Sequence, residues 1–244
     1  MCLTNGFYQP SASMSEHSLA NRHIVVTGGL GVLGRAVGAV LVEHGARVVL
    51  LDRAAAQDVP GITAVIGGID LTDPNATRSA FQQASERLQG FDGLVNAAGG
   101  FRWETLESGA LESWDALYAM NLRSTVVACR EALPRLLAAD GSGIVNVGAL
   151  AAQKAGMGMG AYAASKAGVA RLTEALAEEL KDRGVRVNAV CPSILDTPAN
   201  RSDMPDADTA RWVTPRSLAA VIAFLLSNDA RAVTGACIPV AGRV

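Results

Sequence analysis

Two residues capable of acid–base chemistry, Tyr162 and Lys166, stand four apart in a stretch rich in alanine and leucine. Apolar spacing predicts a long helix over about residues 161–181, and a separation of four places both side chains on one helix face. An ammonium beside a phenol favours the phenolate and lowers its pKa, so Tyr162 can exchange a proton while a hydride moves. Taken alone, the spacing is more typical of neighbours on an exposed helix face.

Residues 23–36 predict a strand, a tight turn and the N-terminus of a helix. Gly29, Gly31 and Gly34 fit the pattern G-x-G-x-x-G, which binds the pyrophosphate of a dinucleotide. Unpaired N–H groups and the positive end of the helix dipole attract an anion there. The residues expected to line this site are Gly28, Gly29, Gly31, Val32 and Leu33.

The second apolar strand, residues 46–52, ends in an acid at the distance from the glycines that the pattern requires. Asp52 is therefore expected to accept hydrogen bonds from the adenosine ribose and to repel a 2′-phosphate, which favours NAD(H) over NADP(H). Arg53 leaves NADP(H) open, because a guanidinium can pair with that phosphate.

Two further segments follow predicted strands, at the edge where open α/β sheets bind ligands. Asp70 and Leu71 are candidates to hold the adenine, although Asp70 is equally well explained as an ordinary loop or cap residue. The small residues Asn96, Ala97, Ala98 and Gly99 let the backbone lie along a cofactor.

Short apolar strands alternate with helical segments along the whole chain, which predicts a single-domain, doubly wound (Rossmann) parallel sheet with helices on both faces. About seven strands are expected, at residues 23–27, 46–52, 62–66, 91–95, 142–147, 186–190 and 236–240. Helices are expected at about 74–88, 112–137, 161–181 and 215–226. Residues 22–244 form the expected catalytic domain, preceded by a mobile tail at 1–21.

The composition narrows the class of protein. A net charge of −2 gives no reason to expect nucleic acid or an anionic membrane as a partner, and no apolar run is long enough to span a bilayer. The four cysteines lack metal-ligand spacing, so we expect no metal and reduced thiols, as in a cytoplasmic protein. The partner is expected to be a small-molecule substrate.

Several of these residues together resemble the short-chain dehydrogenase/reductase family over about residues 22–244. The matching positions are Thr27 with Gly28, Gly31 and Gly34, residues 96–99, Asn121, Tyr162 with Lys166, Pro192, and Thr197. The resemblance implies NAD(P)(H) binding, with Tyr162 as the catalytic acid and Lys166 on the nicotinamide ribose. It also implies that Asn121 supports a proton-relay water and that Pro192, Ile194 and Thr197 lie along the nicotinamide.

One departure from the family pattern bears on the substrate. The family's catalytic serine lies thirteen residues before the tyrosine, where this chain has Ala149. Losing such a donor costs about 2.7–4 kcal/mol in carbonyl reduction, because the hydroxyl holds the oxygen on which charge develops. One branch, the dihydropteridine reductases, is similar in this respect and in the loop at about 193–213. That branch implies an NADH-dependent reductase of a quinonoid dihydropteridine or a similar conjugated heterocycle.

In that interpretation Ala149 and Tyr162 face the substrate, and Phe101 or Trp103 stacks on its flat ring, although plain packing explains both aromatics equally well. A general carbonyl or quinone reductase that tolerates Ala149, and a non-catalytic NAD(H)-sensing protein, are the alternatives. The long helices at 112–137 and 161–181 carry apolar residues on more than one face, which predicts a homodimer or homotetramer built through them.

Overall fold

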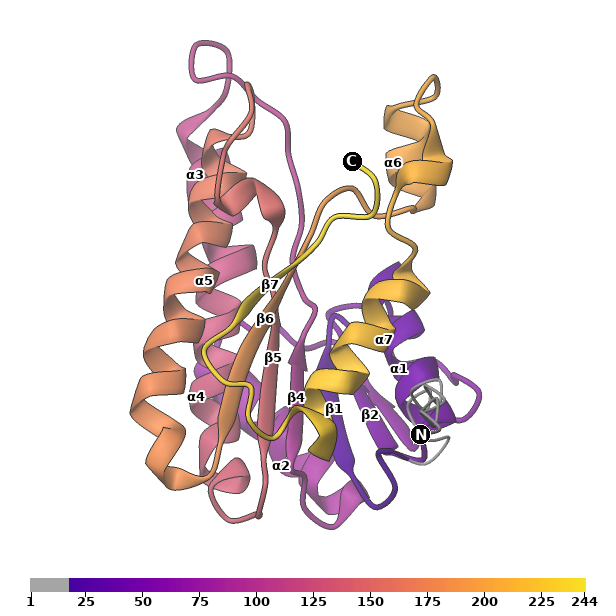
Figure 1. Ribbon diagram of the computed structural model, residues 1–244. Coiled ribbons are helices and arrows are strands. Elements are labelled where there is room, and N and C mark those ends of the chain that lie inside the picture. Colours follow the sequence, from indigo (N-terminus) through magenta and orange to yellow (C-terminus); the bar gives the residue numbers. More distant parts are fainter. Residues whose placement is uncertain (1–17) are drawn as a thin grey trace, which may run out of the picture.

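The computed structural model describes residues 18–244, which form one parallel sheet with helices on both faces (Figure 1). The strand order is β3-β2-β1-β4-β5-β6-β7, and every adjacent pair is parallel. The strands are β1 His23–Thr27, β2 Arg47–Leu51, β3 Ala64–Ile66, β4 Gly93–Asn96, β5 Gly143–Val147, β6 Arg186–Pro192 and β7 Cys237–Val240. The predicted doubly wound fold of seven strands is confirmed.

The central strands are mostly apolar because both of their faces are covered. In β1, Ile24 and Val26 enter one hydrophobic layer and Val25 enters the other. In β2, Val48 and Leu50 enter the first layer, and Val49 and Leu51 enter the second. This alternation follows from the two-residue period of a strand, and continuous apolar runs are what a parallel sheet buried on both sides requires.

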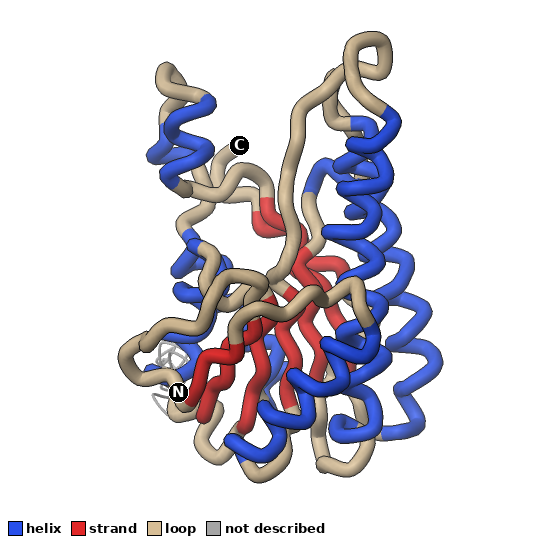
Figure 2. The backbone as a smooth tube through the Cα atoms, turned by 180° about the vertical axis from the view of Figure 1, so that it is seen from behind, coloured by secondary structure: helices blue, strands red, loops and turns tan. Residues whose placement is uncertain are grey.

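The helices divide between these two layers, as the views from front and back show (Figures 1 and 2). Helices α1 and α7 contribute to one layer, and α2, α4 and α5 contribute to the other. The helices are α1 Val32–Glu43, α2 Pro74–Leu88, α3 Leu111–Leu117, α4 Ser124–Leu136, α5 Gly160–Leu180, α6 Pro198–Asp203 and α7 Pro215–Leu226.

Local capping explains two helix starts that the sequence predicts. Asp73 accepts a hydrogen bond from the N–H of Asn75 at 2.8 Å, and Pro74 occupies the first turn of α2. Thr214 and Pro215 repeat this arrangement at the start of α7. A short polar acceptor followed by proline satisfies one free N–H and removes another, so each helix begins where expected.

Three expectations need correction. The single helix predicted over 112–137 is interrupted by a π-helical segment, Tyr118–Arg123, between α3 and α4. The predicted loop at 193–213 contains α6 and a short 3₁₀ turn, Thr209–Arg211. Residues 18–21 belong to the folded domain, because Leu19 is completely buried and its N–H donates to the carbonyl of His44 at 3.0 Å. The rest of the predicted mobile tail, residues 1–17, lies outside the described residues.

Within residues 18–244, no helix is both long enough and apolar enough to cross a bilayer.

Candidate active site

The turn after β1 brings backbone into very close contact at two glycines. Gly28 has a φ of +64°, and a Cβ there would lie 2.7 Å from the backbone of Ala98. A Cβ on Gly34 would lie 2.1 Å from the carbonyl oxygen of Gly28. Only glycine permits this approach, so α1 packs directly against the end of β1.

The N-terminus of α1 has the free donors that a pyrophosphate needs. Its N-cap is Gly31, which supplies no side-chain cap, and its first turn holds no acidic residue. Val32 is 47% exposed at the first helical position, so the backbone there is open to solvent. An uncapped helix N-terminus next to glycines favours an anion, and these residues therefore fit the phosphates of a dinucleotide. Leu33, the next predicted contact, packs its side chain against the core.

Asp52 lies beside this turn. Its carboxylate accepts hydrogen bonds from the N–H groups of Leu30 at 2.8 Å and Ala54 at 2.9 Å. These bonds fix the half-buried carboxylate next to the glycines, where the predicted ribose contact requires it. Arg53 is exposed at the following position.

Asp70 uses its carboxylate within its own turn. The carboxylate accepts from the N–H and the hydroxyl of Thr72 at 2.8 and 2.7 Å, and these bonds lower the pKa of Asp70. This geometry matches the ordinary loop interpretation of Asp70. Leu71 is buried, and the contact of these two residues with adenine stays a prediction.

Asn96 lies inside the sheet, at the end of β4. Its amide donates to Asn146 at 2.9 Å, and its oxygen accepts from the hydroxyl of Thr27 at 3.4 Å. Asn146 donates in turn to Thr173 of α5 at 2.9 Å. These buried hydrogen bonds join the glycine turn after β1 to α5. The side chain of Asn96 therefore contacts the turn through Thr27. Ala97 continues the same connection, since its N–H donates to the carbonyl of Thr27.

Asn121 occupies the π-helical segment and is completely buried. Its carboxamide bonds both the N–H and the carbonyl of Gly100, at 2.8 and 3.1 Å, and donates to the hydroxyl of Ser165 at 2.9 Å. Ser165 donates to the carbonyl of Tyr162 at 2.7 Å. A Cβ on Gly99 would lie 2.7 Å from the Asn121 oxygen, which explains the glycine there.

The sequence interpretation did not include Ser165, although it stands next to Lys166 in the same motif. Its hydroxyl links Asn121 to the first turn of α5. The π-helical segment was also missed, and such segments are frequent at functional sites. The predicted relay role of Asn121 stays a prediction.

Tyr162 and Lys166 lie on α5 as predicted, but their pKa values differ from the expectation. Burial raises the pKa of the Tyr162 phenol to about 12. Burial also lowers the pKa of the Lys166 ammonium to about 8, and this ammonium donates to the carbonyl of Val147 at 2.7 Å. The phenol pKa is therefore raised, where the sequence predicted that the lysine would lower it, because burial removes the hydration that stabilises a phenolate. A phenol with a raised pKa holds its proton and suits a donor.

Ala149 is buried just after β5, where the family pattern has a hydroxyl. Its neighbour Gly148 faces Cys191, whose Sγ would lie 3.0 Å from a Cβ at Gly148. Ser165 of the motif and Ser193 of the loop are engaged elsewhere, because Ser165 donates to the backbone carbonyl of Tyr162 and Ser193 donates to the carbonyl of Ala241, each at 2.7 Å. Neither serine replaces the missing hydroxyl.

The two predicted substrate aromatics behave differently. The ring centroid of Phe101 lies 4.9 Å from that of Tyr162, with an angle of 85° between the planes. Trp103 packs against the loop before α5, since a Cβ on Gly158 would lie 2.2 Å from its indole. Phe101 thus lies against the ring of Tyr162, and contact of either aromatic with substrate stays a prediction.

The predicted nicotinamide-side residues lie at the end of β6 and in the loop beyond it. Pro192 closes β6 beside Val240, and the carbonyl of Ile194 accepts from the N–H of Val213 at 3.0 Å. Thr197 caps α6 by accepting from the N–H of Asn200 at 3.2 Å. Pro192 ends the strand and the other two residues follow it, and their contact with the nicotinamide stays a prediction.

Comparison with known proteins agrees with this geometry. The sequence matches the short chain dehydrogenase family over residues 22–208. The chain is a member of this family. Members of this family use NAD(P), so the chain is an oxidoreductase, and the roles of its glycine turn, Asp52, Tyr162 and Lys166 stay predictions.

Individual relatives cover nearly the whole chain. The "2-(S)-hydroxypropyl-CoM dehydrogenase 3" of Xanthobacter autotrophicus is 31% identical over 93% of this chain and 98% of its own length. The "(3R)-3-hydroxyacyl-CoA dehydrogenase" of Rattus norvegicus is 33% identical over 93% of this chain and 98% of its own. A short chain dehydrogenase from Burkholderia cenocepacia, solved in complex with NADP, has a TM-score of 0.82 and 31% identity, covering 92% of this chain and 98% of its own. None of these three is named a dihydropteridine reductase.

Proposed function

We propose that this short-chain dehydrogenase/reductase is an NADH-dependent reductase of quinonoid dihydropteridine or a similarly conjugated heterocycle. The observation that carries the proposal is the methyl group of Ala149 at the position of the family's serine. A carbonyl needs a fixed donor for the localised charge that forms on its oxygen, whereas a quinonoid ring spreads the incoming charge over its conjugated system. The site therefore suits an acceptor that needs no such donor.

Tyr162 supplies the proton in this proposal. When bound, NADH supplies the hydride, and the protein supplies the proton and holds the cofactor and the acceptor in place. The raised pKa of Tyr162 keeps its phenol protonated near neutral pH, ready to donate to a ring nitrogen. Lys166 presents its remaining N–H donors above Gly99, where they suit a ribose hydroxyl. Asn121 holds the Gly99–Gly100 backbone in place for both groups.

The aromatic contact at the reaction centre supports a flat acceptor. Phe101 is about half exposed and meets Tyr162 edge to face, so part of its ring remains free to contact a ligand. Aromatic side chains stabilise flat rings by stacked and edge-on contacts. A conjugated heterocycle between Phe101 and the cofactor site would contact the exposed part of the Phe101 ring and lie within reach of the Tyr162 phenol.

The proposed preference for NADH rests on Asp52. Its fixed carboxylate lies where a ribose diol is bound and a 2′-phosphate is repelled.

A second candidate function is carbonyl or quinone reduction that tolerates Ala149. Two of the relatives are named as dehydrogenases of hydroxyl-bearing substrates. Oxidation of a hydroxyl gives a carbonyl, so these names favour a carbonyl as the acceptor that this chain reduces. This alternative predicts turnover of simple aldehydes or ketones that improves when Ala149 is replaced by serine.

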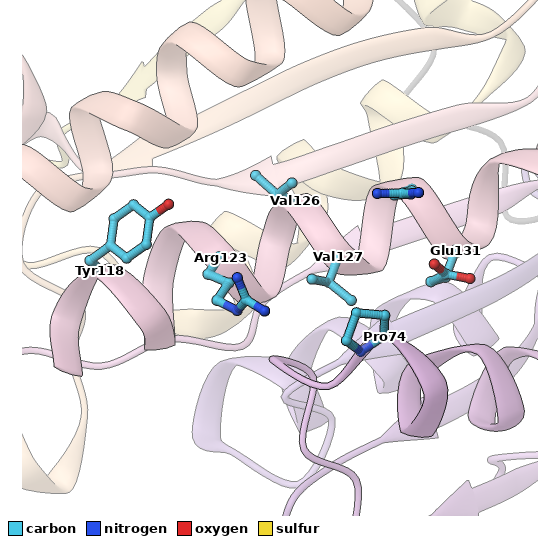
Figure 3. Close-up of a pocket in the computed structure, with 7 residues that line it drawn as sticks. Pro74, Tyr118, Arg123, Val126, Val127 and Glu131 are labelled. Atoms are coloured by element: carbon cyan, nitrogen blue, oxygen red, sulfur yellow. The ribbon is translucent and has the colours of Figure 1, made fainter. Parts of the chain in front are cut away.

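We also propose that the chain assembles as a homodimer or homotetramer through α4 and α5. Large apolar side chains remain exposed on the α3–α4 side, including Trp114, Tyr118 and Met120, and Val126 is exposed on α4. Figure 3 shows Tyr118 and Val126 beside a hollow on α4 that Arg123 and Glu131 also line. Light scattering after size exclusion tests this proposal, and a monomer alone at micromolar protein contradicts it.

The test of the enzymatic proposal is steady-state NADH oxidation with chemically generated quinonoid dihydropterin, with a simple aldehyde as the control acceptor. We expect rapid turnover of the pterin, an inert aldehyde, and a loss of about 10²–10⁴-fold in kcat for Tyr162→Phe. Tyr118→Phe is the matched control, because Tyr118 is exposed on the π-helical segment. NADH binding without turnover of either acceptor contradicts the proposal and favours the non-catalytic sensor.

A further inference from the structure

The two limbs of the loop at 193–213 meet where the loop leaves the sheet. The N–H of Asp196 donates to the carbonyl of Val213 at 2.8 Å, and the N–H of Val213 donates to the carbonyl of Ile194 at 3.0 Å. Beyond this neck the loop carries α6, which stands clear of the end of the sheet (Figure 1). The neck therefore sets where the loop lies relative to the reaction centre.

The segment after β7 contacts both limbs of this loop, and Figure 1 shows it running from β7 toward them. On the first limb, the hydroxyl of Ser193 donates to the carbonyl of Ala241 at 2.7 Å. On the second limb, the N–H of Arg243 donates to the carbonyl of Arg211 at 3.0 Å, and Nε of Arg211 donates back to the carbonyl of Arg243 at 2.9 Å. The guanidinium of Arg243 also donates to the carbonyl of Ala210 at 2.9 Å.

Gly242 makes this double contact possible. Its φ is +63°, a conformation that other residues rarely adopt, and a Cβ there would lie 2.6 Å from the carbonyl oxygen of Arg211. A side chain at this position would push the segment away from the second limb. Glycine is thus required by the contact itself as well as by the backbone angle.

We propose that Gly242 and Arg243 are positioning residues that hold the loop at 193–213 over the site. They act through the backbone of Ala210 and Arg211, and so through the neck that joins Ile194 to Val213. This inference rests on the proposed function and adds to it that the loop closes over the acceptor. Loosening the contact should weaken acceptor binding more than it slows the chemical step.

The first test is amide hydrogen exchange on the full chain, followed at the N–H groups of Asp196 and Val213. Gly242→Ala should accelerate exchange at both amides by about tenfold, because the neck opens more often. Gly184→Ala is the matched control, since Gly184 also has a positive φ of +75° but a Cβ there would meet open space. We expect the control to leave exchange at the neck unchanged.

The second test avoids backbone strain altogether. Arg243→Ala removes an exposed side chain and its bond to Ala210, and Arg231→Ala removes another exposed arginine that has no contact with the loop among the described hydrogen bonds. Arg243→Ala should raise neck exchange and the KM for the acceptor by about three- to tenfold with little change in kcat, and the control should change neither.

Unchanged exchange at Asp196 and Val213 in both Gly242→Ala and Arg243→Ala would overturn the inference. Accelerated exchange in a chain that reduces no acceptor supports the positioning role and contradicts only the proposed function. The two proposals therefore fail on different measurements.

Discussion

The Nζ atom of Lys166 lies 2.7 Å from the carbonyl oxygen of Val147, two residues before Ala149. This bond joins α5, which carries Tyr162, to the end of β5, which is followed by Ala149. The bond therefore fixes the position of Tyr162 relative to Ala149. The lysine is buried, and burial lowers its pKa to about 8 from an ordinary value of 10.5.

The lowered pKa of Lys166 gives a stability prediction with a definite sign. Between about pH 8 and 10.5 the unfolded chain binds more protons at this residue than the folded chain, so its contribution to the unfolding free energy rises with pH. We expect the difference in unfolding free energy between the native chain and Lys166→Met to rise by up to about 3 kcal/mol over that window. Urea denaturation at a series of pH values measures it, and parallel curves for the two proteins contradict the prediction.

The phenol of Tyr162 should titrate far above neutral pH. Because its pKa is raised to about 12 by burial, the difference in ultraviolet phenolate absorbance between the native chain and Tyr162→Phe should stay flat through pH 10 and grow only near pH 12. A tyrosine that ionises near pH 7 in the protein without cofactor would restore the expectation that Lys166 lowers the pKa.

The buried chain from Thr27 through Asn96 and Asn146 should contribute measurably to stability. Asn96→Ala leaves the Asn146 oxygen without its 2.9 Å donor inside the core and should lower the unfolding free energy by about 1–3 kcal/mol. Asn75→Ala is the control, because Asn75 is exposed, and should change it by less than about 0.5 kcal/mol. Equal effects of the two substitutions would show that these buried hydrogen bonds add little to the unfolding free energy.

Cofactor preference should depend on Asp52. Asp52→Ala removes the carboxylate that opposes a 2′-phosphate and should lower the ratio of kcat/KM for NADH to that for NADPH by about tenfold or more. Asp58→Ala serves as the control, since Asp58 is an exposed aspartate with no predicted cofactor contact. An unchanged ratio in Asp52→Ala would contradict the role of Asp52 in opposing the 2′-phosphate.

Local patterns predicted the fold because each strand and helix is indicated by the residues within it. Apolar runs that alternate with helical segments determine a parallel sheet, and Asp73 with Pro74 determines where α2 begins. The glycine turn could be recognised from its local pattern, since Gly34 is required by a contact with Gly28 within one strand–turn–helix unit, although the contact between Gly28 and Ala98 joins two distant segments.

The features that were missed arise from contacts between distant segments. The π-helical segment places the Asn121 carboxamide between Gly100 and Ser165, which stand far from it in the sequence. The pKa of Tyr162 depends on burial, which a spacing of four residues does not report. The side chain of Asn96 was assigned to the cofactor edge, but both faces of β4 are covered, and only the structure shows that it turns toward Asn146.

The most direct test of the account restores the missing hydroxyl. The kcat/KM for a quinonoid dihydropterin and for a simple aldehyde, each with NADH, should be measured in the native chain and in Ala149→Ser. We expect aldehyde reduction to rise by about tenfold or more while pterin reduction stays within a few-fold, because only the carbonyl gains a donor for a localised charge. An aldehyde that is already reduced efficiently by the native chain, with no gain in Ala149→Ser, would contradict the claim that Ala149 selects a conjugated acceptor.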